Sequence, residues 1–363
     1  MISKHKTWYL VAVVFLCSII LLVVMRRSGD EGRRSLPQST VADSTFKRPV
    51  TPRSGKTKPE FAPGLGSDFL TQQDEINILA KSNRSPRSLA ALAWLGAPNA
   101  AQYLTEAFAA APDDVMVCYA VLFADLDEDL PIKPAALDNF SRILPEESLP
   151  NILKALQAFS SKDPNAKLLL VKAIAAPKFS DFGVMMAGDA TKCLLAAGWG
   201  VDHARISPLL GRPQSEGSTL ARAVGELGFS LSHAIDGNTR VPLEDAITAL
   251  QLTQKATLSG SLDINSQGGL RYLEQNIFSY LERFSPSELE GYFPDGGFAA
   301  AKEEAKTAYK SNEDIFMQGM NLEGVFNAAS PSIRRELLWR IEREGDFAAF
   351  SWLRETNPAL FKK

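Results

Sequence analysis

The chain has 363 residues, of which 45% are hydrophobic and 22% are charged, so it can bury the core of one long or two ordinary domains. Its formal net charge of −3 conceals two unequal parts. The first 66 residues carry 11 Lys and Arg against 4 Asp and Glu, a net charge of +7, whereas the remainder carries 28 against 38, a net charge of −10. An acidic folded part without a basic stripe repels phosphate, which disfavours nucleic acid as a partner.

An uncharged apolar stretch of 18 residues, Trp8–Met25, dominates the amino terminus. As a helix it is about 27 Å long, enough to cross a bilayer core. A cleaved signal peptide is the competing interpretation, but the stretch leads straight into Arg26 and Arg27 with no small-x-small cleavage pattern. A lipoprotein site at Cys17 is disfavoured because a bulky leucine precedes it. Residues 1–27 are therefore predicted to form an uncleaved transmembrane signal-anchor.

Positive charge flanks both ends of this stretch, so the positive-inside rule does not by itself orient it. A short amino-terminal tail before one apolar helix usually stays in the cytoplasm, and the domain after the helix is exported. We therefore expect a single-pass protein of the inner (cytoplasmic) membrane whose globular part is periplasmic or extracytoplasmic.

Residues 28–66 are rich in Ser, Pro, Lys and Arg and almost empty of large apolar residues. Such a segment cannot bury enough surface to offset its ordering entropy, so it is predicted to be a disordered linker. Its basic cluster around Lys47 and Arg48 can act as a solubilising tether, which is favoured, or can lie on anionic lipid.

Three prolines at near-constant spacing, Pro112, Pro145 and Pro177, end helix-like segments between residues 81 and 181. The intervals are 33 and 32 residues. A fixed period in this range is typical of stacked helical hairpins, in which no unit buries its apolar face alone. Residues 67–182 are thus predicted to form helical repeats.

Small and large apolar residues alternate along the second helix of two of these units. Ala100, Leu104 and Ala107 precede Pro112, and Ala166, Leu170 and Ala173 precede Pro177 after a first helix from Ser148 to Phe159. The middle unit keeps Pro145 but not this seam, and the first helices have neither the Trp nor the Leu-Gly pair of the tetratricopeptide repeat. The series of alanine, leucine, alanine and proline nevertheless resembles the second helix of that repeat.

This resemblance implies an all-α fold that begins with a tetratricopeptide-like (TPR-like) α-solenoid. Members of that superfamily can clamp a peptide carboxylate with basic and amide side chains on the first helices. The corresponding positions here include Cys118, Leu122, Pro150 and Lys154, of which only Lys154 can bind a carboxylate. A carboxylate clamp is therefore not expected.

Residues 183–363 are predicted to be a further, irregular α-helical region, because no alternating β-branched segment of strand length occurs. Helix starts are indicated at Thr71, Ser85-Pro86 and Ser285-Pro286, and Gly268-Gly269 is interpreted as a turn. The expected helices are Val184–Ala197, Thr219–Ile235, Leu243–Leu258, Leu270–Phe284, Phe298–Tyr309, Ile315–Ala329, Ile333–Glu344 and Phe347–Arg354.

No residue set matches a catalytic, cofactor-binding or metal motif, so none is assigned. The acidic run Asp125–Asp129 has neither the Gly nor the Glu of a calcium loop, and His203 and His233 have no further zinc ligand at short spacing. Cys118 and Cys193 are interpreted as core thiols, although an oxidising compartment would permit a pair.

The leading hypothesis is a non-enzymatic, membrane-anchored protein–protein interaction scaffold, similar to bacterial envelope proteins of the tetratricopeptide-like kind. We expect the membrane and a protein, not a nucleic acid, as partners, and no cofactor. The alternative is an envelope enzyme on a helical scaffold, with a site between residues 198 and 297 that uses His203 and His233.

Overall fold

The computed structural model describes residues 70–124, 130–180, 182–210, 216–229, 240–258, 264–294, 297–319, 322–344 and 346–361. The chain divides into two units, Met1–Lys56 and Thr57–Lys363, and every described residue belongs to the second. The described part consists of helices α2 to α18 and one 3-10 helix, and its only extended pairing is an isolated parallel bridge between Glu147 and Lys178. The prediction of an all-α fold is confirmed.

Within these ranges, no helix combines the length and apolarity needed to cross a bilayer. The predicted anchor, Trp8–Met25, and the predicted linker, residues 28–66, lie outside the described residues. Both stay predictions, as do the domain limits at residues 66 and 182.

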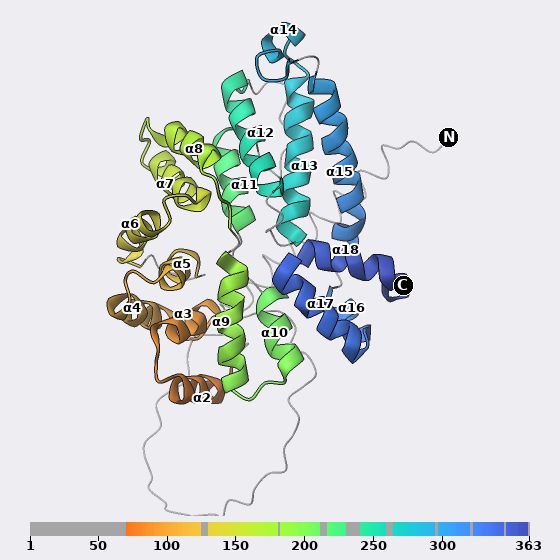
Figure 1. Ribbon diagram of the computed structural model, residues 1–363. Helices are drawn as coiled ribbons and strands as arrows, with labels where there is room; N and C mark the ends of the chain where they lie inside the picture. The colour runs from red at the N-terminus through yellow and green to blue at the C-terminus, as the bar shows by residue number, and fades with distance from the viewer. Residues whose placement is uncertain are drawn as a thin grey trace, which may run out of the picture. The chain divides into compact units, whose positions relative to one another are not determined.

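Consecutive helices pack as antiparallel pairs from the start of the described chain (Figure 1). Helix α2 (Gln72–Ser82) comes first. Three hairpins follow: α3 (Pro86–Trp94) with α4 (Ala100–Ala110), α5 (Val115–Phe123) with α6 (Lys133–Ile143), and α7 (Ser148–Ser160) with α8 (Ala166–Ala175). Each hairpin ends at one of the three periodic prolines, because a proline cannot continue the helix that precedes it.

The predicted seams lie at the contacts inside the first and third hairpins. All six of their residues are buried: Ala100, Leu104 and Ala107 on α4, and Ala166, Leu170 and Ala173 on α8. The middle hairpin was predicted to have no such seam, but α6 also has a buried apolar face. There Phe140 lies five residues before Pro145, as Ala107 lies before Pro112, and an aromatic ring fills the space that alanine leaves elsewhere.

Local capping explains where the first helices begin. Thr71 and Asp74 form a reciprocal capping box at α2, in which the Thr71 amide donates to the Asp74 carboxylate at 3.1 Å. Helix α3 begins with Ser85 as its cap and Pro86 at the first helical position. Both predicted starts are confirmed.

The chain stays helical after α8 but no longer repeats. The remaining helices are α9 (Phe182–Ala196), α10 (Val201–Leu210), α11 (Glu216–Glu226), α12 (Leu243–Leu258), α13 (Ile264–Leu281), α14 (Pro286–Leu289), α15 (Gly297–Gly319), α16 (Leu322–Ala328), α17 (Pro331–Glu344) and α18 (Asp346–Thr356), followed by the 3-10 helix Pro358–Phe361. The predicted capping box is present at α14, where the Glu288 carboxylate accepts from the amide and hydroxyl of Ser285.

The interpretation of Gly268-Gly269 as a turn is wrong, because both glycines lie inside α13. This helix packs against α12 on one side and α15 on the other. Burial of its apolar residues outweighs the cost of two helical glycines, about 1 kcal/mol each.

Two clusters of buried side chains hold the helices together. The first combines α2 to α6 with α9, α10 and α16 to α18. The second combines α7 and α8 with α11 to α15. The last helices of the chain therefore share a core with the first hairpins.

Candidate interaction surface

The first helices of the hairpins are covered by later parts of the same chain. Helix α9 packs against α2, α3 and α5, and α11 packs against α7 (Figure 1). The ring of Phe182, at the start of α9, lies 5.9 Å from Tyr119 of α5 and 5.2 Å from Phe140 of α6. Along α3 and α5, helix α9 therefore covers the face that would hold a ligand in a repeat protein.

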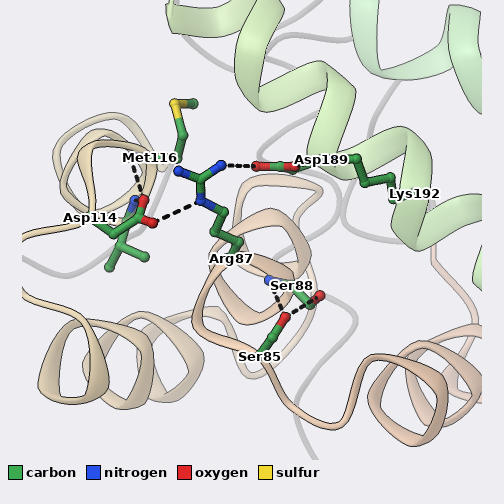
Figure 2. Close-up of polar contacts among 8 residues, drawn as sticks. Ser85, Arg87, Ser88, Asp114, Met116, Asp189 and Lys192 are labelled. Carbon is green, nitrogen blue, oxygen red and sulfur yellow. Dashed lines mark hydrogen bonds and ion pairs between the residues drawn. The ribbon is translucent and has the colours of Figure 1, made fainter.

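A charged cluster joins α9 to the first two hairpins (Figure 2). Arg87 of α3 donates from Nε to Asp114 at 2.8 Å, and its Nη1 lies 4.0 Å from a carboxylate oxygen of Asp189 on α9. Lys192 also pairs with Asp189, at 2.7 Å. The hydrogen bond to Asp114 raises the pKa of Arg87, so the guanidinium stays charged. Asp189 is buried and therefore needs these cations.

Asp114 has a second role in this cluster. Its other carboxylate oxygen accepts the amide protons of Met116, at 2.9 Å, and Val117, at 3.3 Å, at the start of α5. One side chain thus caps α5 and binds α3. Arg87, Asp114 and Asp189 thus connect helices, and Lys192 pairs with Asp189 within α9.

The residues at the predicted groove positions do not form a ligand site. Cys118 and Pro150 are buried, and Leu122 is half-buried. Lys154 forms an ion pair with Asp138 of α6 at 3.3 Å, so its ammonium connects two hairpins. The structure gives no support to a carboxylate clamp there.

Cys118 and Cys193 are free, buried thiols, as the interpretation of core thiols requires. The Cys118 thiol donates to the Pro112 carbonyl at 3.2 Å, and that of Cys193 lies 3.9 Å from the Ser88 carbonyl. Burial raises the pKa of Cys118 to about 11 and that of Cys193 to about 12. Both are protonated and unreactive at neutral pH.

The histidines of the enzyme alternative are not brought together within the described residues. His203 lies half-buried on α10, whereas His233 and the acidic run Asp125–Asp129 lie outside the described part. No cluster of three or more His, Cys, Asp or Glu side chains among the placed residues can hold a metal ion. The site between residues 198 and 297 stays a prediction.

Besides Asp189, the buried carboxylates Glu75, Glu147 and Glu274 were not predicted from the sequence. Glu147 accepts from the Ser180 amide at 3.0 Å. Glu75 of α2 accepts from the Tyr103 hydroxyl and from Asn99, whose amide lies 3.2 Å away, and burial raises the pKa of Tyr103. Glu274 of α13 pairs with Arg271 at 2.8 Å. The Glu75 and Glu274 carboxylates are each satisfied by a neighbouring side chain.

A solvent-facing depression lies on α17. This helix lies beside α18 (Figure 1). Its volume is about 390 Å³, and it is lined by Ser332, Arg335, Glu336 and Trp339. Trp339 is 40% exposed, and the guanidinium of Arg343 lies 4.6 Å from the centre of its ring. We call these five residues the Trp–Arg patch.

Arg340 fixes this patch to the rest of the fold. Its guanidinium lies 4.6 Å from the Trp352 ring of α18 and 5.9 Å from the Trp339 ring. Its Nε donates to Glu336 at 3.0 Å and its Nη1 to Glu344 at 3.0 Å. Arg340 thus neutralises Glu336 and orients Trp339.

The sequence predicted the helix Ile333–Glu344 but not this surface, because the exposure of Trp339 depends on how α18 packs. The four-residue spacing of Arg335, Trp339 and Arg343, which places them on one face of the helix, was the sequence signal that could have indicated this surface. No protein-family model, no curated protein and no solved structure matches this chain.

Proposed function

We propose that this protein is a helical scaffold, tethered to a membrane, that binds another protein through the Trp–Arg patch. The observation that carries the proposal is the exposed Trp339 between two arginines at the edge of a depression. Tryptophan and arginine are the residues most enriched among those that dominate binding energy at protein interfaces. The charged groups around Arg87 and Glu75, in contrast, connect helices, and Glu274 pairs with Arg271 within α13.

The rest of the proposal concerns architecture and location. The hairpins α3 to α8 form a TPR-like solenoid, supported by the proline spacing and the two buried seams. Trp8–Met25 anchors the chain in the inner membrane, and residues 28–66 tether an extracytoplasmic domain. The length and hydropathy of Trp8–Met25 support the anchor, and the short tail before it supports the orientation.

Binding is tested by photo-crosslinking of the full-length protein in intact cells. A photoreactive amino acid replaces Ser332, which lines the depression, and in a control it replaces Glu303, an exposed residue of α15. A discrete protein adduct from position 332 and none from position 303 is expected. Adducts at neither position, with both variants expressed and folded, would refute binding through this surface.

Location is tested with a reporter fused after Lys363 that is active on only one side of the membrane. We expect activity outside the cytoplasm and resistance of the protein to carbonate extraction. A cytoplasmic reporter would reverse the proposed orientation, and release by carbonate would eliminate the anchor.

A further inference from the structure

We infer that the Trp–Arg patch binds an acidic segment of the partner, with an apolar side chain against Trp339 and carboxylates on Arg335 and Arg343. This inference rests on the proposed function and specifies the chemistry of the partner. Arg335, Trp339 and Arg343 are spaced by four residues each, so they follow one another along one face of α17. The patch is therefore a row of cation, aromatic ring and cation.

The two outer arginines have no acidic partner within the described residues. Arg335 makes one weak contact, from Nε to the Pro331 carbonyl at 3.4 Å, and Arg343 only stacks on Trp339. The neighbouring Arg340 is fully engaged by Glu336 and Glu344. Two uncompensated guanidinium groups thus remain on a folded part whose net charge is −10 from residue 67 onward.

Guanidinium groups of this kind bind carboxylates through paired, charge-assisted hydrogen bonds. The depression beside Trp339 supplies an apolar wall and the Ser332 hydroxyl, and it has room for a side chain of the bound segment. Stacking of Arg343 also holds the ring in place, which reduces the entropy lost on binding.

An anionic membrane surface is the competing occupant, and the patch suits it less well. A helix that lies on a bilayer presents a row of apolar side chains with basic residues around them. Among the described side chains of α17, Trp339 is the only large exposed hydrophobic one.

The test uses full-length protein in detergent, labelled with 5-fluorotryptophan and observed by fluorine NMR. The Trp339 resonance is assigned among the five tryptophans with Trp339→Phe. The probe is a blocked hexapeptide that combines several Asp and Glu with one Phe, and the control peptide carries amides in place of the carboxylates. We expect the acidic peptide alone to shift the Trp339 resonance in a saturable way.

Matched variants separate the patch from overall charge. Arg335→Gln and Arg343→Gln should each weaken binding of the acidic peptide about tenfold. The control pair Arg283→Gln and Lys310→Gln removes exposed cations elsewhere and should leave the affinity within about twofold. Equal losses in both sets, or no shift at millimolar peptide, would overturn the inference.

Two further outcomes would assign the patch to a different ligand or refute acidic recognition. A shift of Trp339 on addition of vesicles rich in anionic lipid, without one for the peptide, would assign the patch to the membrane and overturn the inference. Partner adducts from position 332 that persist in Arg335→Gln/Arg343→Gln would leave the scaffold function intact but refute acidic recognition. Loss of those adducts in the double variant, with the control pair unaffected, is the expected result.

Discussion

Arg87 is more than half exposed, yet its contacts involve three helices. A surface ion pair alone contributes little, because water screens it and two long side chains lose freedom. Here the carboxylate of Asp114 is already fixed by the amides that it caps, so Arg87 meets a preorganised partner. At the scale of single residues, the helix cap formed by Asp114 therefore contributes more to stability than its ion pair with Arg87.

Replacement of this cap tests that view. Asp114→Ala removes the acceptor of two helix amides and the partner of Arg87, and it should lower the free energy of unfolding by about 1–2 kcal/mol. Asp113→Ala is the matched control, because Asp113 forms an exposed ion pair with Arg142, and it should cost below about 0.5 kcal/mol. Thermal unfolding followed by circular dichroism measures both, and equal losses would contradict the capping role.

The buried thiols predict a pH dependence. The folded-state pKa values of about 11 and 12 lie above the ordinary value of 9.0, so folding favours the protonated form. This contribution to stability is complete below pH 9 and is lost as the pH rises through 11 to 12.

Alkylation measures the same burial directly. In a Cys17→Ser background, iodoacetamide at pH 8 should label Cys118 and Cys193 only after denaturation. Labelling of the native protein as fast as that of the unfolded chain would show that the thiols are accessible.

At the scale of helices, local signals were predictable and contacts distant in sequence were not. The caps at Thr71, Ser85 and Ser285 and the seam of α4 depend on residues within one or two turns, which a sequence displays directly. The continuity of α13 through its glycine pair depends on α12 and α15. The closure of the first helices by α9 depends on residues about a hundred positions away, for which no local pattern exists.

The seam of α4 offers a direct comparison within one helix. Ala107→Asp places a carboxylate in a fully buried contact between α3 and α4, and it should destabilise the protein by at least about 3 kcal/mol. Ala109→Asp, two residues further along the helix and exposed, should cost less than about 1 kcal/mol. Unchanged helicity and melting temperature in Ala107→Asp would refute the packing of the hairpin.

The end of α11 provides a second pair of variants. Gly228 has φ of +98°, and an added Cβ would lie 2.8 Å from a methyl carbon of Val241, so Gly228→Ala should cost at least about 1 kcal/mol. Gly225 lies inside the helix with open space around it, so Gly225→Ala should stabilise by up to about 1 kcal/mol. Chemical denaturation distinguishes the two, and changes of the same sign would contradict this account of the helix end.

At the scale of the whole molecule, the first and the last described helices contribute side chains to one buried cluster. The first core extends in sequence from Leu70 to Leu353 and includes side chains of α16, α17 and α18. A solenoid in which each unit contacts only its neighbours is stable as a sum of units. In this protein α9 instead covers the first hairpins, and the last helices join the same buried cluster, so its stability is shared across the length of the described chain.

That closure has a consequence for biosynthesis. Helix α9 begins about 90 residues after the end of α3, which at ordinary rates of translation is an interval of about 5–20 s. Until α9 has emerged, the hairpins α3 to α6 exist with the apolar surface that α9 covers exposed to solvent. Nascent chains arrested before α9 should be cut by protease within these hairpins, whereas chains that include α9 should resist; equal resistance would show that the hairpins fold as they emerge. Emergence of α9, rather than of each hairpin, then sets the moment at which the first hairpins become resistant to proteolysis.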